Sequence, residues 1–250
     1  MKHTEHYTVR WHDTDALRQM RPSALMALMQ ETSSLQFVRA GRSLDAMRDR
    51  DGMGFIVSRL AFDVLEPMAP FDEIRVETFT CEGRGYTFPR GFYVYRGDRL
   101  VARCHSVWAL VRIADRTLVR VEDAPLGFED EPVAETEMPL RFRVPRELTF
   151  ERVGERTIAF SDLDGNMHMN NTKYPDMVCD FLPDPVSCRV AGMSIAFHRE
   201  AKFGEVLTVE RAAAADGVYY FRTTKDGTVY MEAMVRAVPR EGGAHADQKS

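Results

Sequence analysis

The sequence predicts an α+β fold of two tandem units, in each of which one helix is wrapped by an antiparallel sheet. Three observations support this prediction. Segments in which apolar and polar residues alternate, as they do in half-buried strands, recur along most of the chain. Helical spacing of apolar residues interrupts that pattern once in each half. The two interrupted regions align without gaps, residues 11–29 on residues 160–178, at a constant offset of 149 positions.

The strand candidates form one group in each half of the chain. Alternation predicts strands over residues 7–11, 56–64, 73–80, 86–95 and 100–113, and again over residues 190–198, 206–212, 218–223 and 229–238. Arg96-Gly97-Asp98 and Asp226-Gly227 each lie between two neighbouring candidates, and such short Gly- and Asp-containing sequences favour hairpin turns. The flanking strands are therefore expected to pair antiparallel.

Two helices are expected. The first covers residues 22–41, because Pro22 suits the first helical turn and Gly41 suits the end. Its apolar stripe consists of Leu25, Leu28, Met29, Thr32, Leu35 and Val38. The second covers residues 171–182 and is ended by Pro183.

The gapless alignment indicates an internal duplication, in which Asp13 corresponds to Asp162 and Asp15 to Asp164. The segment between the halves is rich in Glu and Pro and has weak periodicity, as linkers do. The expected organisation is an N-terminal unit over residues 1–124, a linker over residues 125–145, a C-terminal unit over residues 146–240 and a disordered tail over residues 241–250.

The composition is that of an ordinary globular protein. A net charge of −5 over 250 residues gives no sign of a nucleic-acid partner. The polar first residues contain no apolar signal-peptide core, and no apolar run approaches the length of a membrane span. The four cysteines show no C-x-x-C spacing, which indicates reduced thiols. We therefore expect a cytoplasmic protein without a membrane span.

All three asparagines of the chain, Asn166, Asn170 and Asn171, lie within residues 162–174, which read DLDGNMHMNNTKY. A turn or a helix cap accounts for one asparagine but not for all three. This concentration marks the segment as the candidate active site.

The chemistry of the segment suits hydrolysis. If the chain approaches the second helix in an extended conformation, Asp164, Asn166 and His168 point to one side, beside the helix N-terminus. A helix N-terminus offers N–H groups that polarise a carbonyl oxygen. At the corresponding positions the first half has Leu17 and Gln19 instead of the asparagine and the histidine, so we expect that half to be catalytically silent.

The segment closely resembles the D-L-D-x-N-x-H-x-N-N-x-x-Y segment of acyl-acyl-carrier-protein (acyl-ACP) thioesterases. The stretches LMQETSSLQFVRAG and SVWALVRIADRTLVRV also resemble that family, and the resemblance extends from Tyr7 to Val238. It implies a double hot dog fold, hydrolysis of fatty acyl-ACP to free fatty acid and ACP, no cofactor and no metal. It also implies the acyl carrier protein as the partner of a monomer or homodimer.

The family's catalytic residues fall on Asp164, Asn166, His168 and Glu200. Glu200 stands in FHREAKF, where alternation predicts that His198 and Glu200 share a face. Many relatives carry a cysteine directly after this glutamate, whereas this chain has Ala201, so no cysteine nucleophile is available there. The resemblance implies that Asp164 is the nucleophile or the base for water, while His168 and Glu200 orient and deprotonate water. Asn166 would orient the thioester, and backbone N–H groups at the helix start would receive the oxyanion.

Other interpretations stay open. A metal site would use Asp162, Asp164, His168, His198 and Glu200, without a familiar ligand spacing. Ser194 loosely matches the nucleophile elbow of an α/β-hydrolase, but no helix is expected after it.

Nearer alternatives are an acyl-CoA thioesterase of the hot dog superfamily, a hot dog hydratase or dehydratase, and a non-catalytic acyl-binding protein. For the carrier protein, arginines at positions 84, 90, 96, 99 and 103 suggest a basic docking patch.

Overall fold

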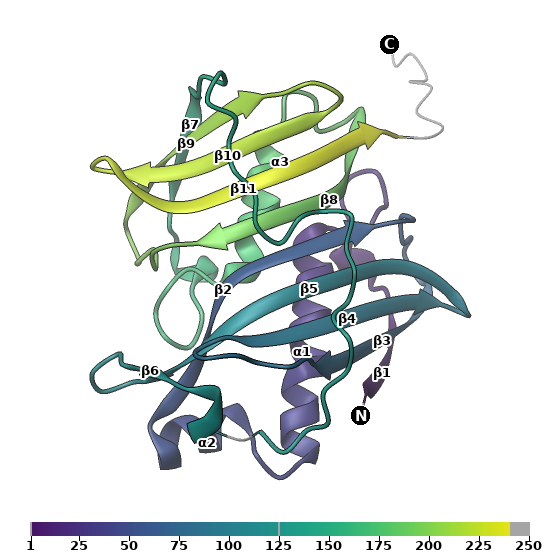
Figure 1. Ribbon diagram of the computed structural model, residues 1–250. Coiled ribbons are helices and arrows are strands. Elements are labelled where there is room, and N and C mark those ends of the chain that lie inside the picture. The colour runs from purple at the N-terminus through teal and green to yellow at the C-terminus, as the bar shows by residue number, and fades with distance from the viewer. Residues whose placement is uncertain (1, 125, 241–250) are drawn as a thin grey trace.

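Strands β2 (Met53–Val64) and β8 (Cys188–Phe197), one from each half of the chain, pair antiparallel at the centre of one continuous sheet (Figure 1). The computed structural model describes residues 2–124 and 126–240. Within those residues the sheet has 11 strands in the order β1-β3-β4-β5-β2-β8-β11-β10-β9-β7, with β6 beside β5. The predicted α+β fold of two helix-and-sheet units is confirmed.

The other strands of the N-terminal unit are β1 (His3–Thr8), β3 (Glu73–Thr80), β4 (Phe88–Arg96), β5 (Arg99–Arg112) and the short β6 (Leu118–Val119). Those of the C-terminal unit are β7 (Glu151–Thr157), β9 (Val206–Ala213), β10 (Val218–Lys225) and β11 (Thr228–Pro239). Both predicted hairpin turns are confirmed. The second has left-handed backbone at Asp226 (φ 50°) and Gly227 (φ 73°), as a tight Asp-Gly turn requires.

Each half of the sheet wraps one helical segment, seen behind the strands in Figure 1. In the N-terminal unit this segment is α1 (Pro22–Arg39), which agrees with the predicted first helix. In the C-terminal unit a 3₁₀ turn (Asn171–Lys173) leads into α3 (Tyr174–Asp180). The predicted second helix therefore exists but is shorter and tighter at its start.

The apolar face of α1 is wider than the predicted stripe. Leu25, Met29 and Thr32 are buried as expected, whereas Val38 is 53% exposed. Met26 and Phe37, outside the stripe, are also buried. A helix that a curved sheet surrounds on several sides buries more of its circumference than a helix lying on a flat layer.

Helix α2 (Leu44–Asp51) was not predicted, because only Met47 among its residues is buried and no apolar stripe exists. The residues that indicate this helix lie at its two ends. The Ser43 side chain accepts a hydrogen bond from the Ala46 backbone N–H (3.0 Å), and Gly52 ends the helix in the left-handed conformation.

One strand prediction is misplaced, and strands β6 and β7 were not predicted. β1 ends at Thr8, and Trp11 lies in a 3₁₀ turn (Trp11–Asp13), so the expected strand over residues 7–11 is wrong in its position. Strand β7 has the sequence ERVGERT, with no buried residue in it. It was missed because an edge strand with two partly solvated faces shows no alternation of burial.

One cluster of buried apolar residues extends through both units. It includes Leu25, Met29 and Phe62 of the first half together with Met177 and Ile195 of the second. The two units therefore share a core across the β2–β8 pair.

Residues 126–150 contain no strand or helix and cross the face of the sheet opposite the helices (Figure 1). The fully buried Asp63 on β2 holds this segment, because its carboxylate accepts hydrogen bonds from the backbone N–H groups of Glu137 (2.7 Å) and Met138 (3.0 Å). The predicted boundaries at residues 124/125 and 145/146 stay predictions, and the expected tail over residues 241–250 lies outside the described residues. No helix in the described part of the chain is long and apolar enough to cross a membrane.

Candidate active site

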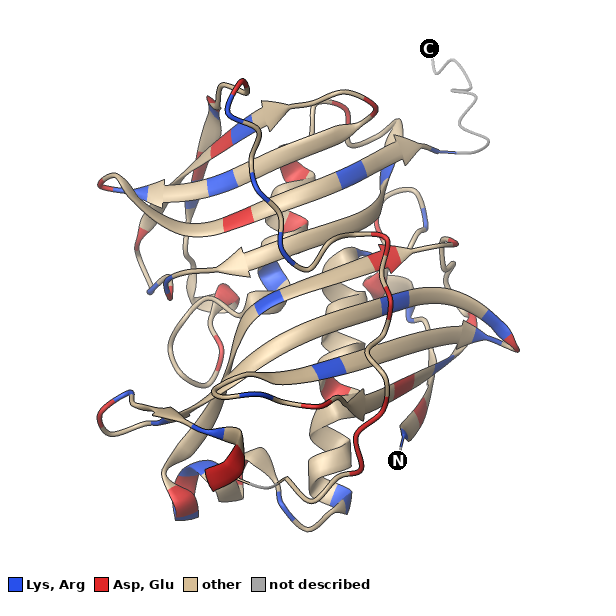
Figure 2. Cartoon of the chain, viewed as in Figure 1, with Lys and Arg blue, Asp and Glu red and all other residues tan. Residues whose placement is uncertain are grey.

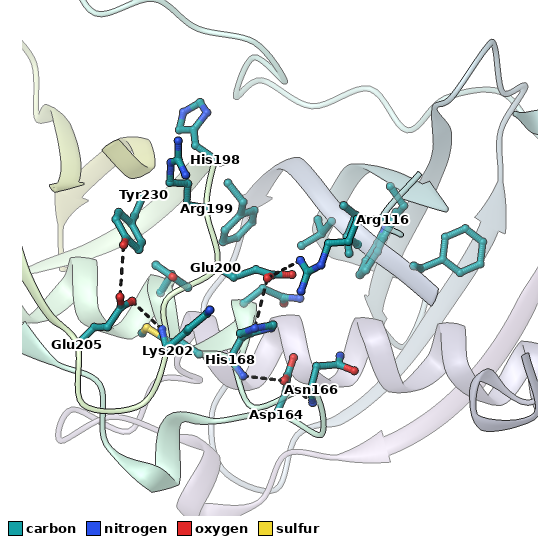
Figure 3. A pocket seen from close by; sticks show the side chains of 18 residues that line it. Arg116, Asp164, Asn166, His168, His198, Arg199, Glu200, Lys202, Glu205 and Tyr230 are labelled. Carbon is teal, nitrogen blue, oxygen red and sulfur yellow. Dashed lines mark hydrogen bonds and ion pairs between the residues drawn. The ribbon is translucent and has the colours of Figure 1, made fainter. Parts of the chain in front are cut away.

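A cavity of about 560 Å³ is lined by residues of both units (Figure 3). Strands β2 and β5 and the hairpin after β5 contribute from the N-terminal unit. The segment before α3 and the loop after β8 contribute from the C-terminal unit. All four predicted catalytic residues line the cavity: Asp164, Asn166, His168 and Glu200.

Residues 164–168 form a tight turn, so the predicted extended approach is wrong. The Asp164 backbone N–H donates to the His168 carbonyl (2.8 Å), and Met167 has a left-handed backbone (φ 63°). The Asp164 Oδ1 atom accepts hydrogen bonds from the backbone N–H groups of Asn166 (2.8 Å) and His168 (3.3 Å). The turn therefore holds the Asp164 carboxylate against the backbone of His168, with Asn166 exposed at its tip.

The Glu200 carboxylate meets the imidazole across the cavity. Glu200 Oε2 lies 3.3 Å from His168 Nε2, and Arg116 Nη1 donates to the same oxygen at 2.6 Å. The loop after β8 thus brings Glu200 to the turn that precedes α3, 32 positions earlier at His168. These two segments were predicted to meet, and they do.

His198 does not join them. The backbone N–H groups of His198 (2.9 Å) and Arg199 (3.1 Å) both bind the Tyr230 carbonyl, which breaks the alternation of the strand. The His198 ring instead lies 3.0 Å from Glu232, pointing away from Glu200 in Figure 3. The expectation that His198 and Glu200 share a face is therefore wrong.

The start of the second helical segment offers fewer backbone donors than expected. Asn170 caps it, because its Oδ1 accepts from the Thr172 backbone N–H (3.0 Å) and its carbonyl accepts from the Lys173 N–H (2.9 Å). Neither of these N–H groups is free to receive an oxyanion. Asn171 lines the cavity, and its Oδ1 accepts from Gln30 Nε2 of α1 (2.6 Å), so its amide is held from the other unit.

The first half repeats this turn in detail. The Asp15 N–H donates to the Gln19 carbonyl (2.8 Å), and Asp15 Oδ1 accepts from the N–H groups of Leu17 (2.8 Å) and Gln19 (3.0 Å). A second cavity of about 560 Å³ adjoins it, but Asp15 Oδ2 is bound by Arg240 Nη2 (2.8 Å). The aspartate thus has a structural role in both halves, and the imidazole exists in only one.

An apolar cavity of about 140 Å³ adjoins the candidate site, since Phe55 and Trp108 line both. Phe37 and Phe88 also line it, as does the buried Arg90. Burial lowers the pKa of Arg90 to about 10, which leaves the guanidinium charged at neutral pH. Aromatic walls next to polar groups suit a ligand with an apolar chain and a polar reacting end.

Neither the metal site nor the serine site finds support in the geometry. In the described part of the chain no three His, Cys, Asp or Glu side chains lie close enough to hold a metal ion. Asp162 binds Arg156 (2.6 Å) and the Ala159 N–H (2.9 Å) instead. Ser194 is fully buried, and its hydroxyl donates to the Pro139 carbonyl (2.7 Å).

No cysteine lines the candidate site, and Ala201 is fully buried. Burial raises the pKa of the Cys81 thiol to about 11 and also raises the pKa values of the Cys104 and Cys179 thiols. Burial likewise raises the pKa of Cys188. Because thiolate is the reactive form, all four thiols are expected to react slowly near neutral pH.

Alkylation therefore tests whether a thiol takes part in catalysis. Iodoacetamide at pH 8 is expected to leave thioester hydrolysis essentially unchanged, and labelling should accelerate as the pH rises toward the raised thiol pKa values. The measurement is residual activity against moles of label per chain. Rapid loss of activity with one label, prevented by substrate, would contradict a thiol-independent mechanism.

Several cavity residues were not among the predicted catalytic residues: Arg116, Asn171, Tyr174, Lys202, Glu205 and Tyr230. Asn171 and Tyr174 belong to the segment of residues 162–174, so the sequence pattern that marked this segment could also have identified them. Glu205 accepts from Lys225 Nζ (2.8 Å), and only the three-dimensional pairing of β9 with β10 brings these two together. No local sequence pattern marked Arg116, because its partner Glu200 lies 84 positions away in the sequence.

Two family models match the chain. The model of the acyl-ACP thioesterase N-terminal domain matches residues 1–126, and that of the C-terminal domain matches residues 149–236. The chain is 25% identical over 217 residues to the chloroplastic acyl-[acyl-carrier-protein] hydrolase FATB3 of Cuphea viscosissima. That match covers 80% of this chain and 52% of the relative, so the chain spans about half the length of this curated protein.

Solved structures share the fold. An acyl-ACP thioesterase from Bacteroides thetaiotaomicron superposes with a TM-score of 0.84 at 19% identity, over 95% of this chain and 98% of that one. The 12:0-ACP thioesterase from Umbellularia californica gives a TM-score of 0.81 at 19% identity, over 96% and 98% of the two chains. The double hot dog fold is thereby confirmed. With both family models matched in order along it, the chain belongs to the acyl-ACP thioesterase family.

Proposed function

We propose that this protein hydrolyses fatty acyl-ACP thioesters, releasing free fatty acid and ACP, with Asp164, Asn166, His168 and Glu200 as catalytic residues. The observation that carries the proposal is the convergence of Asp164 and the His168–Glu200 pair on one cavity. Such a site belongs with hydrolysis, because it combines an imidazole base, two carboxylates and an adjoining apolar compartment.

In the proposed reaction, His168 and Glu200 together take a proton from a water molecule as its oxygen attacks the thioester carbonyl carbon. The C–S bond then breaks, and the carrier thiolate leaves and is protonated. In the alternative route, Asp164 attacks the carbonyl and water cleaves the resulting anhydride. In both routes one water is consumed and one fatty acid and one thiol are formed.

The two carboxylate oxygens of Asp164 have different roles in this proposal. Oδ1 accepts from two backbone N–H groups, which fixes the carboxylate. Oδ2 makes neither of these contacts and is the oxygen we assign to catalysis. The exposed Asn166 amide at the rim of the cavity would donate to the thioester carbonyl as negative charge develops on its oxygen.

The apolar 140 Å³ cavity beside Phe55 and Trp108 would receive the acyl chain. Its position supports an acyl group that enters the N-terminal unit while the carbonyl stays at the C-terminal residues.

Three arginines of the sequence cluster are buried or paired with carboxylates, so they do not support a docking patch there. Arg90 is buried, Arg96 binds Glu66 (2.9 Å) and Asp72 (2.8 Å), and Arg103 binds Asp63 (2.8 Å). Figure 2 shows acidic and basic residues interspersed along these strands.

The mouth of the cavity is the better candidate for meeting an acidic carrier. Arg199 and Lys202 both line the cavity and are exposed. We place this reaction in the cytoplasm and expect a monomer or a homodimer.

The test is a comparison of carriers. Purified protein is given the same acyl chains on ACP and on coenzyme A, over a range of chain lengths, and kcat/KM is measured for each. The proposal expects faster hydrolysis on ACP at every accepted length. A preference for coenzyme A would replace it with an acyl-CoA thioesterase, and binding without turnover would replace it with an acyl-binding protein.

A further inference from the structure

We infer that Arg116, a residue of the N-terminal unit, is a positioning residue for the catalytic Glu200 of the C-terminal unit. This inference rests on the proposed function. Arg116 Nη1 donates to Glu200 Oε2 at 2.6 Å, and the same oxygen lies 3.3 Å from His168 Nε2 (Figure 3). The guanidinium and the imidazole therefore approach one carboxylate oxygen from two units.

The hairpin after β5 is built to present this side chain. The Arg116 N–H donates to the Arg112 carbonyl (2.9 Å), and Asp115 Oδ1 accepts from the Thr117 N–H (3.0 Å) and hydroxyl (2.7 Å). Arg116 itself has φ 59°, a left-handed conformation that is disfavoured for any residue other than glycine. Glycine would suit this backbone conformation better, so the turn itself does not require an arginine.

The Glu200 side chain needs a contact from another residue to fix its conformation. It follows the end of β8 at Phe197, in an exposed segment outside the strand ladder, and its side chain is 36% exposed. A partly exposed glutamate on a loop samples several rotamers. The hydrogen bond from Arg116 to Oε2 selects one of them and leaves Oε1 as the oxygen for water.

The exposed ion pair adds little to the stability of the fold. The Arg116 side chain is 66% exposed, and ion pairs in such surroundings contribute little to folding. Its effect is therefore expected in the geometry of catalysis. The N-terminal unit, which lacks the imidazole, would in this way still complete the site of its partner unit.

The first experiment compares Arg116→Gln with Arg120→Gln. Arg120 lies four positions further along the same hairpin, is similarly exposed (54%) and binds Glu122 (3.1 Å), away from the cavity lining. We expect Arg116→Gln to lower kcat for acyl-ACP about ten-fold with KM within about two-fold, because orientation is lost in the bound complex. Arg120→Gln should match the wild type. Arg116→Lys should restore part of kcat, since it keeps the charge but not the planar fork.

Arg116→Gly separates catalysis from folding. Glycine adopts φ 59° without strain. The melting temperature of the Arg116→Gly variant should therefore equal or exceed that of the wild type, while its kcat should fall as in Arg116→Gln. A raised KM with an unchanged kcat in Arg116→Gln would contradict the inference and assign Arg116 to carrier binding.

A double-mutant cycle then tests that Arg116 acts through Glu200. Rates are measured in single turnover with enzyme in excess, so that slow variants stay measurable. On a Glu200→Gln background, Arg116→Gln is expected to change the rate less than about two-fold, because the two side chains are coupled. The same ten-fold loss on that background would overturn the inference.

The imidazole gives a readout independent of turnover. The chain has seven histidines, and His168→Gln identifies the imidazole NMR signal of His168. Arg116→Gln should shift this signal and Arg120→Gln should not; an unmoved signal would contradict the inference. A wild-type protein that hydrolyses no acyl thioester would contradict the proposed function instead, and the NMR result would still decide whether Arg116 positions the Glu200–His168 pair.

Discussion

Asp164→Asn is expected to lower kcat/KM for acyl-ACP hydrolysis at least about 100-fold while the protein stays folded. The reason lies in the turn of residues 164–168. The backbone N–H groups of Asn166 and His168 donate to Asp164 Oδ1, and an asparagine Oδ1 accepts the same two bonds. The substitution therefore keeps the turn and removes the negative charge and the second carboxylate oxygen.

The duplicated half supplies a matched control. Asp15→Asn changes the same residue in the same turn, where Oδ1 accepts from Leu17 and Gln19, but no imidazole is present. It should leave kcat/KM close to the wild-type value. Circular dichroism and melting temperature of both variants show whether the fold is retained. A folded Asp164→Asn protein with near-normal hydrolysis would remove Asp164 from the proposed mechanism.

Asp63→Ala is expected to reduce the free energy of unfolding by about 3–5 kcal/mol, the largest effect on stability of the substitutions considered. The Asp63 side chain is fully buried and accepts from Arg103 Nε (2.8 Å) and from the backbone N–H groups of Glu137 and Met138. Alanine leaves the backbone N–H groups of Glu137 and Met138 without this acceptor, and it removes the buried carboxylate partner of Arg103. It also frees the segment that crosses the outer face of β2.

Urea denaturation at 25 °C measures this loss, and limited proteolysis should show faster cleavage within residues 126–150. Asp63→Asn should be milder, because its Oδ1 still accepts one of the backbone bonds. Glu122→Ala, which removes an exposed partner of Arg120, is the control and should leave the urea midpoint unchanged. A loss below about 1 kcal/mol in Asp63→Ala would show that Asp63 does not anchor this segment.

Local patterns predicted the regular part of the fold. Most strands of both units agree with the alternation of apolar residues to within a few positions, and β3 agrees at both ends. Pro22 located the start of the first helix, and the 149-residue offset located the second copy of the duplicated segment. Such features depend on neighbours in sequence, and periodicity records them directly.

Features that depend on distant partners were not predicted. The bulge at His198 and Arg199 forms against the Tyr230 carbonyl, so alternation along β8 could not reveal that His198 turns away from Glu200. The ion pair of Arg116 with Glu200 joins residues of different units. The 164–168 turn was mistaken for an extended segment because its left-handed residue is Met167 rather than glycine.

The candidate site shows the same division. The sequence motif and the family resemblance predicted four catalytic residues, and all four line one cavity: Asp164, Asn166, His168 and Glu200. Their catalytic roles stay predictions. The oxyanion donors assigned to the helix start were wrong for Thr172 and Lys173, because Asn170 already binds both N–H groups.

Intact-mass spectrometry of the carrier tests the central claim most directly. Purified acyl-ACP is incubated with the wild-type protein and, in parallel, with folded His168→Ala. The account predicts that the wild type converts the acyl-ACP mass to that of holo-ACP with release of free fatty acid, and that His168→Ala does so at least about 100-fold more slowly. An acyl-ACP mass that persists with the wild type, or equal conversion by His168→Ala, would contradict hydrolysis at this cavity.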